Sequence, residues 1–258
     1  MPDIATTSRR DFIMTGSSMM LAAGCGLRPS RENRGNSVLS DLGFKMVSLP
    51  GGRFRTGDIE DPGLDREEPV RTVTVDGFDM SAYEVTVGQF KAFTEETGYR
   101  TEAERGDQAY IFTSKEWMRK PDANWKNPYL RQTDRHPVVC VSWNDSVAFC
   151  EWLSKKTGQA IDLPTGIEWE YACRAETATR FYWGADPYLD DSLAYCWWWY
   201  NAENVKENCA HVVGQKLPNG FGLYDMSGNV WEWCEDDYHL TYTGAPGDGR
   251  AWVDLPRS

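Results

Sequence analysis

The sequence has little positive charge, few histidines and no run of apolar residues long enough to cross a membrane. Its 258 residues carry 27 Lys and Arg against 39 Asp and Glu, a formal net charge of −12. Nucleic-acid backbones are bound by clustered Lys and Arg, and no basic run or basic helix face occurs, so we expect no nucleic-acid partner. The three histidines are scattered and the seven cysteines contain no C-x-x-C pair, which leaves a structural zinc site without support.

Aromatic residues, in contrast, are abundant. They make up 13% of the chain, with 12 Trp, so the surface available for burial is concentrated in large flat side chains. No internal repeat and no clear internal linker is present, and 258 residues suffice for one large domain with a sizeable core. We therefore expect a globular protein, with most of its acidity on a solvated surface and a minority of it binding a cation.

The first residues resemble a bacterial export signal. Arg9 and Arg10 form a twin-arginine pattern before a modestly apolar run that is too short and too rich in Gly and Ser to span a bilayer. Small residues at 22–24 then lead into Cys25, as at a lipoprotein processing site, although Leu21 lies one place further from the cysteine than usual. We expect residues 1–25 to be a twin-arginine signal peptide with a lipobox-like end.

This interpretation predicts an exported protein, either periplasmic or a membrane-anchored lipoprotein of a bacterium. The membrane attachment would be a lipid on Cys25 and not a transmembrane helix. Two alternatives stay open: a signal peptide cleaved without lipidation, or a buried N-terminal helix. Residues 26–43 are polar and lack periodicity, which predicts a linker before a domain over residues 44–258. Export also makes disulfides possible among the other six cysteines.

Start signals predict three helices in the first two thirds of the domain. They are a helix over 87–97 opened by a capping box of Thr86 and Gln89, a helix over 144–157 capped by Asn144, and a helix that follows a capping box of Thr165 and Glu168. Strands are expected on both sides of a turn at 51–52 and again over 71–86. Beyond Arg180, aromatic pieces alternate with Gly, Pro and Asn, so we expect loops there and an α+β fold.

Five separated segments resemble the formylglycine-generating enzyme (sulfatase-modifying factor) domain family. They occur in the family's order and cover about residues 45–237: MVSLPGGRFRTGD, EEPVRTVTVDGFDMSAYEVTVGQFKAFTEETGY, HPVVCVSWNDSVAFCEWLSKKTG, LPTGIEWEYACRAET and PNGFGLYDMSGNVWEW. The resemblance implies the formylglycine-generating-enzyme fold, which is related to C-type lectins and has little regular secondary structure. It also implies a range of activities, because a fold does not settle the chemistry.

The resemblance implies a calcium ion in the GNVWEW region. By motif match, Asp225 and Glu232 would provide carboxylate oxygens, and Gly228 and Val230 would provide backbone carbonyls. Calcium accepts such mixed oxygen ligands, and two carboxylates on one dication avoid the cost of unpaired buried charge. The alternative is that Asp225 caps a turn and Glu232 pairs with an arginine. The family's second calcium site is expected to be absent, because the matching segment 194–197 lacks the amide side chain.

The family's catalytic cysteines follow an Arg-Gly-Gly-Ser-Trp segment, and the sequence given has no such segment. The resemblance therefore predicts that the domain's C-terminal part is missing. The catalytic residues stay unknown, and copper would bind only if a missing C-terminus supplies the cysteine pair. Cys150 and Cys173 match positions that pair with that segment in many relatives; the alternative is that they are buried thiols acting as small hydrophobes.

Two functions follow from this resemblance. The first is an exported formylglycine-generating-type protein, in a family that oxidises a sulfatase cysteine with molecular oxygen; its partner would be a sulfatase or another exported polypeptide. The second is a non-catalytic, lectin-like module that binds glycans or peptides. The aromatic run 197–200 would suit a binding groove, although core packing is expected for most of it. A thiol-histidine sulfoxide synthase is disfavoured, because the chain lacks the His-rich helical domain that it needs.

Overall fold

The computed structural model describes residues 21–23, 26–27, 33–59, 67–113, 116–186, 188–198, 201–202 and 210–254. Arg9, Arg10 and Cys25 lie outside these ranges, so the signal peptide and the lipid anchor stay predictions. Within the described residues, none of the helices combines the length and the apolar character that a membrane crossing requires.

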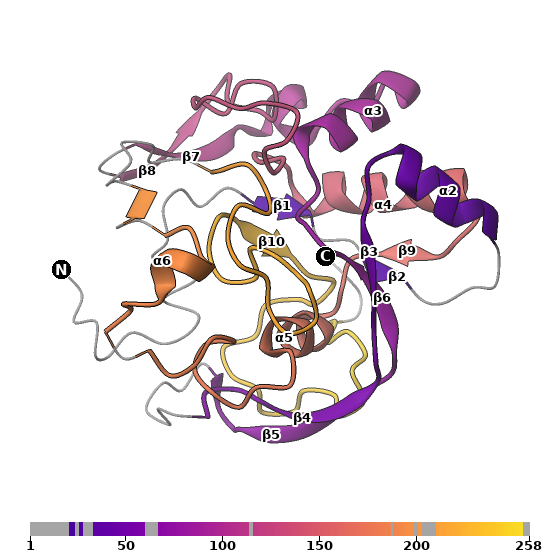
Figure 1. The fold of residues 1–258 in the computed structure, drawn as a ribbon. Helices are drawn as coiled ribbons and strands as arrows, with labels where there is room; N and C mark the ends of the chain where they lie inside the picture. The colour runs from indigo at the N-terminus through magenta and orange to yellow at the C-terminus, as the bar shows by residue number, and fades with distance from the viewer. Residues whose placement is uncertain are drawn as a thin grey trace.

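The regular elements are short and are joined by long loops (Figure 1). The strands are β1 (Leu21–Ala23), β2 (Gly26–Leu27), β3 (Met46–Leu49), β4 (Gly52–Thr56), β5 (Arg71–Val75), β6 (Phe78–Ser81), β7 (Ala109–Thr113), β8 (Glu116–Lys120), β9 (Ile161–Asp162) and β10 (Trp231–Trp233). The helices are α2 (Asn33–Asp41), α3 (Val87–Thr97), η3 (Ala103–Asp107), α4 (Trp143–Thr157), α5 (Gly166–Arg174) and α6 (Ser192–Tyr195). This is the α+β fold that the sequence predicts.

The described strands form one four-stranded sheet and three two-stranded sheets. One sheet has the order β3-β6-β2-β9, and three two-stranded sheets pair β4 with β5, β7 with β8 and β1 with β10. The turn at 51–52 was predicted to join two neighbouring strands, but β3 and β4 do not pair with each other. Each pairs antiparallel with a later strand, because β5 and β6 return along them after the loop that follows Thr56.

The predicted linker 26–43 is partly wrong. Residues 33–41 form helix α2, and Leu39, only 2% exposed, belongs to the main core together with Phe44. Gly35 allows α2 to approach the end of α4 closely, since a Cβ there would lie 2.5 Å from the Gln159 side chain. The folded part therefore begins before Phe44, because one buried leucine in a polar segment anchors the helix against the core.

The predicted capping boxes are confirmed at two helices. The side chains of Thr86 and Thr165 each accept the backbone N–H of the third helical residue, and that residue's side chain accepts in return. The prediction for α4 was off by two positions. Its cap is Ser142 and not Asn144, because Ser142 and Asp145 form a third capping box that satisfies two backbone N–H groups.

A buried ion pair fastens α5 to the end of β4. Arg174 Nη2 lies 2.7 Å from Glu170 Oε1 and also donates to the Gly57 carbonyl at 2.6 Å. Glu170 Oε2 accepts the hydroxyl of Thr56 at 2.5 Å. With these partners the buried charges are satisfied, so α5 and the β4–β5 ribbon are held as one unit.

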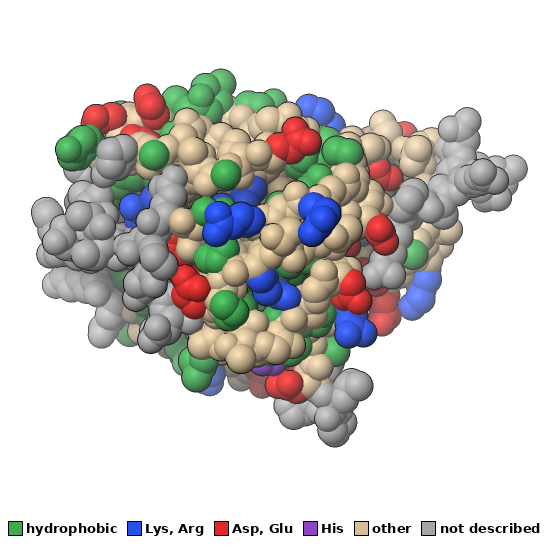
Figure 2. Space-filling view, turned by 90° about the horizontal axis from the view of Figure 1, so that it is seen from below, with side chains coloured by type: hydrophobic (Ala, Val, Ile, Leu, Met, Phe, Trp, Pro, Cys, Tyr) green, Lys and Arg blue, Asp and Glu red, His purple; other side chains and the backbone are tan. Residues whose placement is uncertain are grey.

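Two large hydrophobic clusters form the interior. One lies around α3 and α4 and includes Phe90 and Phe149, and the other lies between α5 and the β4–β5 ribbon. In Figure 1 these clusters correspond to the upper and the lower part of the ribbon, with β10 between them. Seen from the β4–β5 side, Figure 2 shows Lys and Arg side chains over the middle of the face and Asp and Glu around them, so the net negative charge is unevenly spread.

Candidate metal site

The site is built on the turn that precedes β10. The backbone N–H of Tyr224 donates to the Ala82 carbonyl at 2.9 Å, which fixes the start of the turn beside the loop after β6. Asp225, Gly228 and Asn229 have φ of 57°, 109° and 57°, so the chain coils in the left-handed sense between the two predicted carboxylate ligands. A cation site that uses backbone oxygens would need carbonyls of this turn to point to a common side.

Gly228 is required by a close approach. A Cβ at this position would lie 2.2 Å from the Trp197 carbonyl oxygen, and that same oxygen accepts the backbone N–H of Asn229 at 2.8 Å. The turn is therefore pressed against the segment 194–197. Cys196 in that segment is fully buried, and Asn201 Nδ2 donates to its carbonyl at 2.7 Å.

Three carboxylates lie at this turn, and one of them was missed by the sequence analysis. Asp225 and Glu84 are only 2% and 3% exposed. Glu232 is half-buried as a whole residue, but its carboxyl group is desolvated. Glu84 precedes α3 and sits in the family-like segment SAYEVT, where nothing in the spacing marks it as a partner of a turn 140 residues later. Only the three-dimensional structure brings it to the site.

Asn229 links the parts of the site. Its Nδ2 donates to Glu84 Oε2 at 3.1 Å and to the His211 carbonyl at 3.2 Å, and its Oδ1 accepts the His211 backbone N–H at 2.8 Å. Asp225 Oδ2 accepts the Gly214 N–H at 2.6 Å. The other oxygens, Glu84 Oε1 and Asp225 Oδ1, are buried without any hydrogen-bond partner. Two orphaned carboxylate oxygens at one turn indicate that something positive belongs there.

The electrostatics agree with this arrangement. Burial raises the pKa of Asp225 to about 6, opposed by the Gly214 hydrogen bond and the charge of Lys216. Burial, and then the charge of Asp225, raise the pKa of Glu232 to about 7. Burial raises the pKa of Glu84 well above its usual value, and the charges of Asp225 and Glu232 raise it further. The charges of Asp225 and Glu232 thus add to the cost of ionising neighbouring acids, and a bound cation would lower that cost.

The carboxylates alone do not complete a metal site. Within the described ranges, no group of three or more His, Cys, Asp or Glu side chains converges as metal ligands do. A cation here needs backbone oxygens as well, which the predicted set provides through the carbonyls of Gly228 and Val230. The donor set of carboxylates and carbonyls suits Ca²⁺, which takes six to eight oxygen ligands. The residues present therefore fit a calcium ion.

The alternative roles of the two carboxylates receive different support. Asp225 does accept a backbone N–H, from Gly214, so part of its role is to hold a loop. Glu232 makes no salt bridge with any Arg or Lys among the described residues. Trp169 lowers the pKa of Glu232, although its Nε1 closes no hydrogen bond of normal geometry. The alternative, in which Glu232 pairs with an arginine, therefore finds no support in the described part of the chain.

The other singled-out residues are used in packing. Trp197 stacks on His211 with ring centroids 3.8 Å apart, and Trp198 Nε1 donates to Ser192 Oγ at 3.1 Å, while residues 199–200 lie outside the described ranges. Cys150 and Cys173 are buried in the two large clusters, as their interpretation as small hydrophobes predicts. Trp197 and Trp198 thus pack against neighbouring side chains, which agrees with the expected core role.

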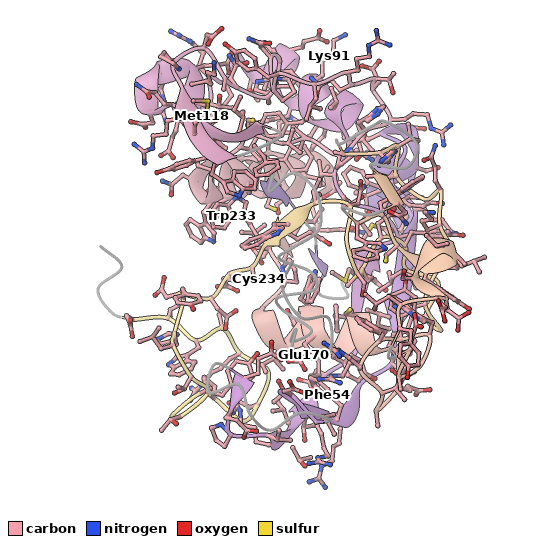
Figure 3. All side chains as sticks on the ribbon, turned by 90° about the vertical axis from the view of Figure 1, so that its left-hand side faces the viewer. Phe54, Lys91, Met118, Glu170, Trp233 and Cys234 are labelled. Atoms are coloured by element: carbon pink, nitrogen blue, oxygen red, sulfur yellow. The ribbon has the colours of Figure 1, made fainter. Side chains whose placement is uncertain are left out.

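Two of the described cysteines, Cys140 and Cys196, do not resemble nucleophiles. Burial raises the pKa of Cys140 to about 12, and it raises the pKa of Cys196 further still. A reactive thiol needs a lowered pKa and access. Cys234 is half-buried and follows β10; Figure 3 shows it with Trp233 between the part that bears Lys91 and Met118 and the part that bears Phe54 and Glu170.

The sulfatase-modifying factor enzyme 1-like domain model matches residues 39–255. The formylglycine-generating enzyme of Thermomonospora curvata is 37% identical over 235 residues, which cover 78% of this chain and 75% of that protein. The mouse enzyme of the same name is 36% identical over 222 residues, and the match covers 74% of this chain but only 58% of the mouse protein. A bovine relative, "Inactive C-alpha-formylglycine-generating enzyme 2", is 34% identical and covers 81% of this chain and 76% of its own length.

Among solved structures, PvdO from Pseudomonas aeruginosa superposes with a TM-score of 0.65 at 33% identity, covering 81% of this chain and 77% of that one. The family model spans the described core, the turn at 225–232 and the loop before it. Sequence relatives and the solved structure thus agree on one fold and one family. The chain belongs to the family of the sulfatase-modifying factor enzyme 1-like domain.

Proposed function

We propose that this chain is the domain of an exported formylglycine-generating-type protein whose turn at 225–232 holds a structural calcium ion. The observation that carries the calcium proposal is the buried turn with two unpartnered carboxylate oxygens, on Asp225 and Glu84. Calcium would be held by the carboxylates of Asp225 and Glu232 with the carbonyls of Gly228 and Val230. Bound there, it supplies the positive charge that the buried acids lack.

The calcium proposal is tested by thermal unfolding with and without a chelator. A ligand at about 100 times its Kd stabilises the folded state by about 2.7 kcal/mol, so the wild type should lose several degrees in chelator. The double variant Asp225→Ala, Glu232→Ala should show no such difference. An unchanged midpoint for the wild type, or an equal change in the double variant, would argue against calcium at this turn.

For the activity, we propose the family's oxidation of a cysteine in a sulfatase or another exported polypeptide. The high pKa of Cys140 and Cys196 keeps these thiols from serving as the nucleophile. A copper-binding cysteine pair would therefore not include Cys140 or Cys196. Incubation of the full-length gene product with Cu(I), oxygen and a sulfatase-type cysteine peptide should yield an aldehyde that a hydrazide captures. No aldehyde with the full-length product would contradict the proposed activity.

A second candidate is a non-catalytic binding module of the same fold. It is favoured by one observation, that a relative named as inactive matches this chain about as well as the enzymes do. The same peptide separates the two functions: binding without turnover by the full-length product supports the module, and turnover supports the oxidase.

Export and lipid anchoring are proposed from the twin-arginine pattern of Arg9 and Arg10 and from the small residues before Cys25. In a bacterial host, Cys25→Ala should move the protein from the membrane to the soluble periplasmic fraction, because the acyl chains supply the membrane affinity. Replacement of both arginines by lysine should keep it in the cytoplasm. Unchanged fractionation of the Cys25 variant would argue against lipidation but not against export.

A further inference from the structure

Glu84 occupies a fixed place beside the calcium turn. On one side of it the Ala82 carbonyl accepts the N–H of Tyr224 at 2.9 Å, and on the other the Val85 carbonyl accepts the N–H of Val138 at 2.8 Å. The carboxylate itself is bonded through Oε2 to Asn229, which lies inside the turn. Backbone and side chain therefore hold Glu84 against the turn in one position.

The charge of Glu84 has no positive partner among the residues that the structure describes. Among the described residues, no salt bridge involves Glu84, and its Oε1 makes no hydrogen bond. A buried carboxylate that accepts one amide hydrogen bond and faces two further carboxylates is costly. A neutral side chain would be buried here at a lower cost in free energy. We therefore expect the charge of Glu84 to contribute to binding the ion.

Lys216 supplies one positive charge to the same region. Its Nζ lies 3.8 Å from the ring centroid of Trp197 and donates to the Leu193 carbonyl at 2.5 Å. Burial lowers the pKa of Lys216, and the charge of Asp225 opposes this; burial raises the pKa of Asp225, and the charge of Lys216 opposes that. Among the described residues, the region thus contains three carboxylates, on Glu84, Asp225 and Glu232, and the ammonium group of Lys216.

We propose that Glu84 and Lys216 set the charge of the site so that one divalent cation makes it neutral. Three negative charges and one positive charge leave −2, which Ca²⁺ cancels. Glu84 acts here through its charge and through Asn229, and it is a positioning residue and not one of the motif's ligands. The inference rests on the calcium site proposed above and extends it to two residues outside the motif.

The test uses two single variants and their combination in the full chain. Glu84→Gln keeps an acceptor for Asn229 but removes the charge, so calcium should bind about tenfold more weakly, ~1.4 kcal/mol. Lys216→Met keeps the apolar stem on Trp197 but removes the positive charge, so calcium should bind more tightly, by roughly threefold to tenfold on the same scale. In the double variant two carboxylates and no ammonium group remain, so the net charge is again −2 and calcium should bind within about threefold of the wild type.

Calcium titration calorimetry gives the affinities, and Tb³⁺ luminescence sensitised by the neighbouring tryptophans reports that the ion binds at this turn. The exposed Glu95→Gln is the matched control and should leave the affinity unchanged. Calcium-free unfolding midpoints identify any variant that fails to fold; if Glu84→Gln fails, the tighter binding of Lys216→Met decides.

Different outcomes overturn different statements. If the wild type binds no calcium, the proposed site fails and this inference fails with it. If the wild type binds calcium but Glu84→Gln binds equally well, or Lys216→Met binds more weakly, the site stands and the charge-setting role is wrong. A double variant as weak as Glu84→Gln would mean that Glu84 acts as a ligand and not through the net charge, which also overturns the inference.

Discussion

The closest backbone approach at the site predicts that Gly228→Ala is severely destabilising. The added Cβ would lie 2.2 Å from the Trp197 carbonyl oxygen, a distance that no real Cβ contact shows. The neighbouring atom belongs to the backbone, which cannot swing away as the end of a side chain does. Either Trp197 or the turn must move, and then the hydrogen bond from the Asn229 N–H to that carbonyl is lost.

The magnitude follows from three contributions. At φ of 109° a non-glycine residue is strained by about 1–3 kcal/mol. Overpacking against a rigid neighbour costs about 1–3 kcal/mol more, and the lost hydrogen bond about 1 kcal/mol. Because relaxation relieves part of this sum, we expect a loss of about 3–5 kcal/mol. The control is Gly98→Ala at the end of α3, where φ is 69° and no atom lies within 4 Å of the added Cβ, and the expected cost is about 1 kcal/mol.

Urea unfolding of both variants in saturating calcium, followed by tryptophan fluorescence, gives the comparison. The difference of about 3 kcal/mol corresponds to a Tm lower by about 6–12 °C for Gly228→Ala than for Gly98→Ala. Calcium affinity should fall only in the Gly228 variant, since the turn must distort. Equal destabilisation of the two variants, with equal calcium binding, would refute the close packing of the turn against Trp197.

Three further predictions concern the acid cluster and the helices. The pKa of Asp225 is raised to about 6 in the folded state, so the protein in chelator should lose about 3 kcal/mol of stability from this group as pH rises from about 4 to 6. The variant Asp225→Asn should lack this loss in chelator, and identical pH profiles of the two proteins would contradict the prediction. Arg174→Met should cost about 3–5 kcal/mol in urea unfolding, because it leaves Glu170 buried without its cation, and replacing both residues by apolar ones should recover part of this. Ser142→Ala should destabilise by about 1 kcal/mol and Asn144→Ala by less than about 0.5 kcal/mol, and the reverse order would restore Asn144 as the cap.

Local signals in the sequence predicted local structure well. The boxes at Thr86 and Thr165 join residues three positions apart, so the pattern alone contains the whole interaction. Ser142 and Asp145 form the same kind of box, but Asn144 is also a good cap and stands next to the apolar residues. The sequence therefore predicts a helix start two residues too late. The segments that resemble the family predicted the fold and the turn at 225–232, because composition and spacing within each segment identify the family.

Interactions between distant residues were not predictable in the same way. Glu84 and Asn229 are 145 positions apart, and no periodicity connects a glutamate before a helix with an asparagine in a later turn. The sequence does not predict helix α2, because its stability depends on a single buried side chain, Leu39, among polar neighbours. The register of β3 and β4 depends on strands that return later in the chain, so a turn between them could not settle their pairing.

The side chain of Asn229 imposes a chemical requirement of its own. It donates to Glu84 and accepts from the His211 N–H at the same time, and among side chains only a carboxamide offers both groups at that reach. Slow hydrolysis of this amide to a carboxylate would turn the donor into a second acceptor facing Glu84. A single spontaneous ageing reaction would then replace the 3.1 Å hydrogen bond with two acceptors, and the link between Glu84 and the turn would be lost.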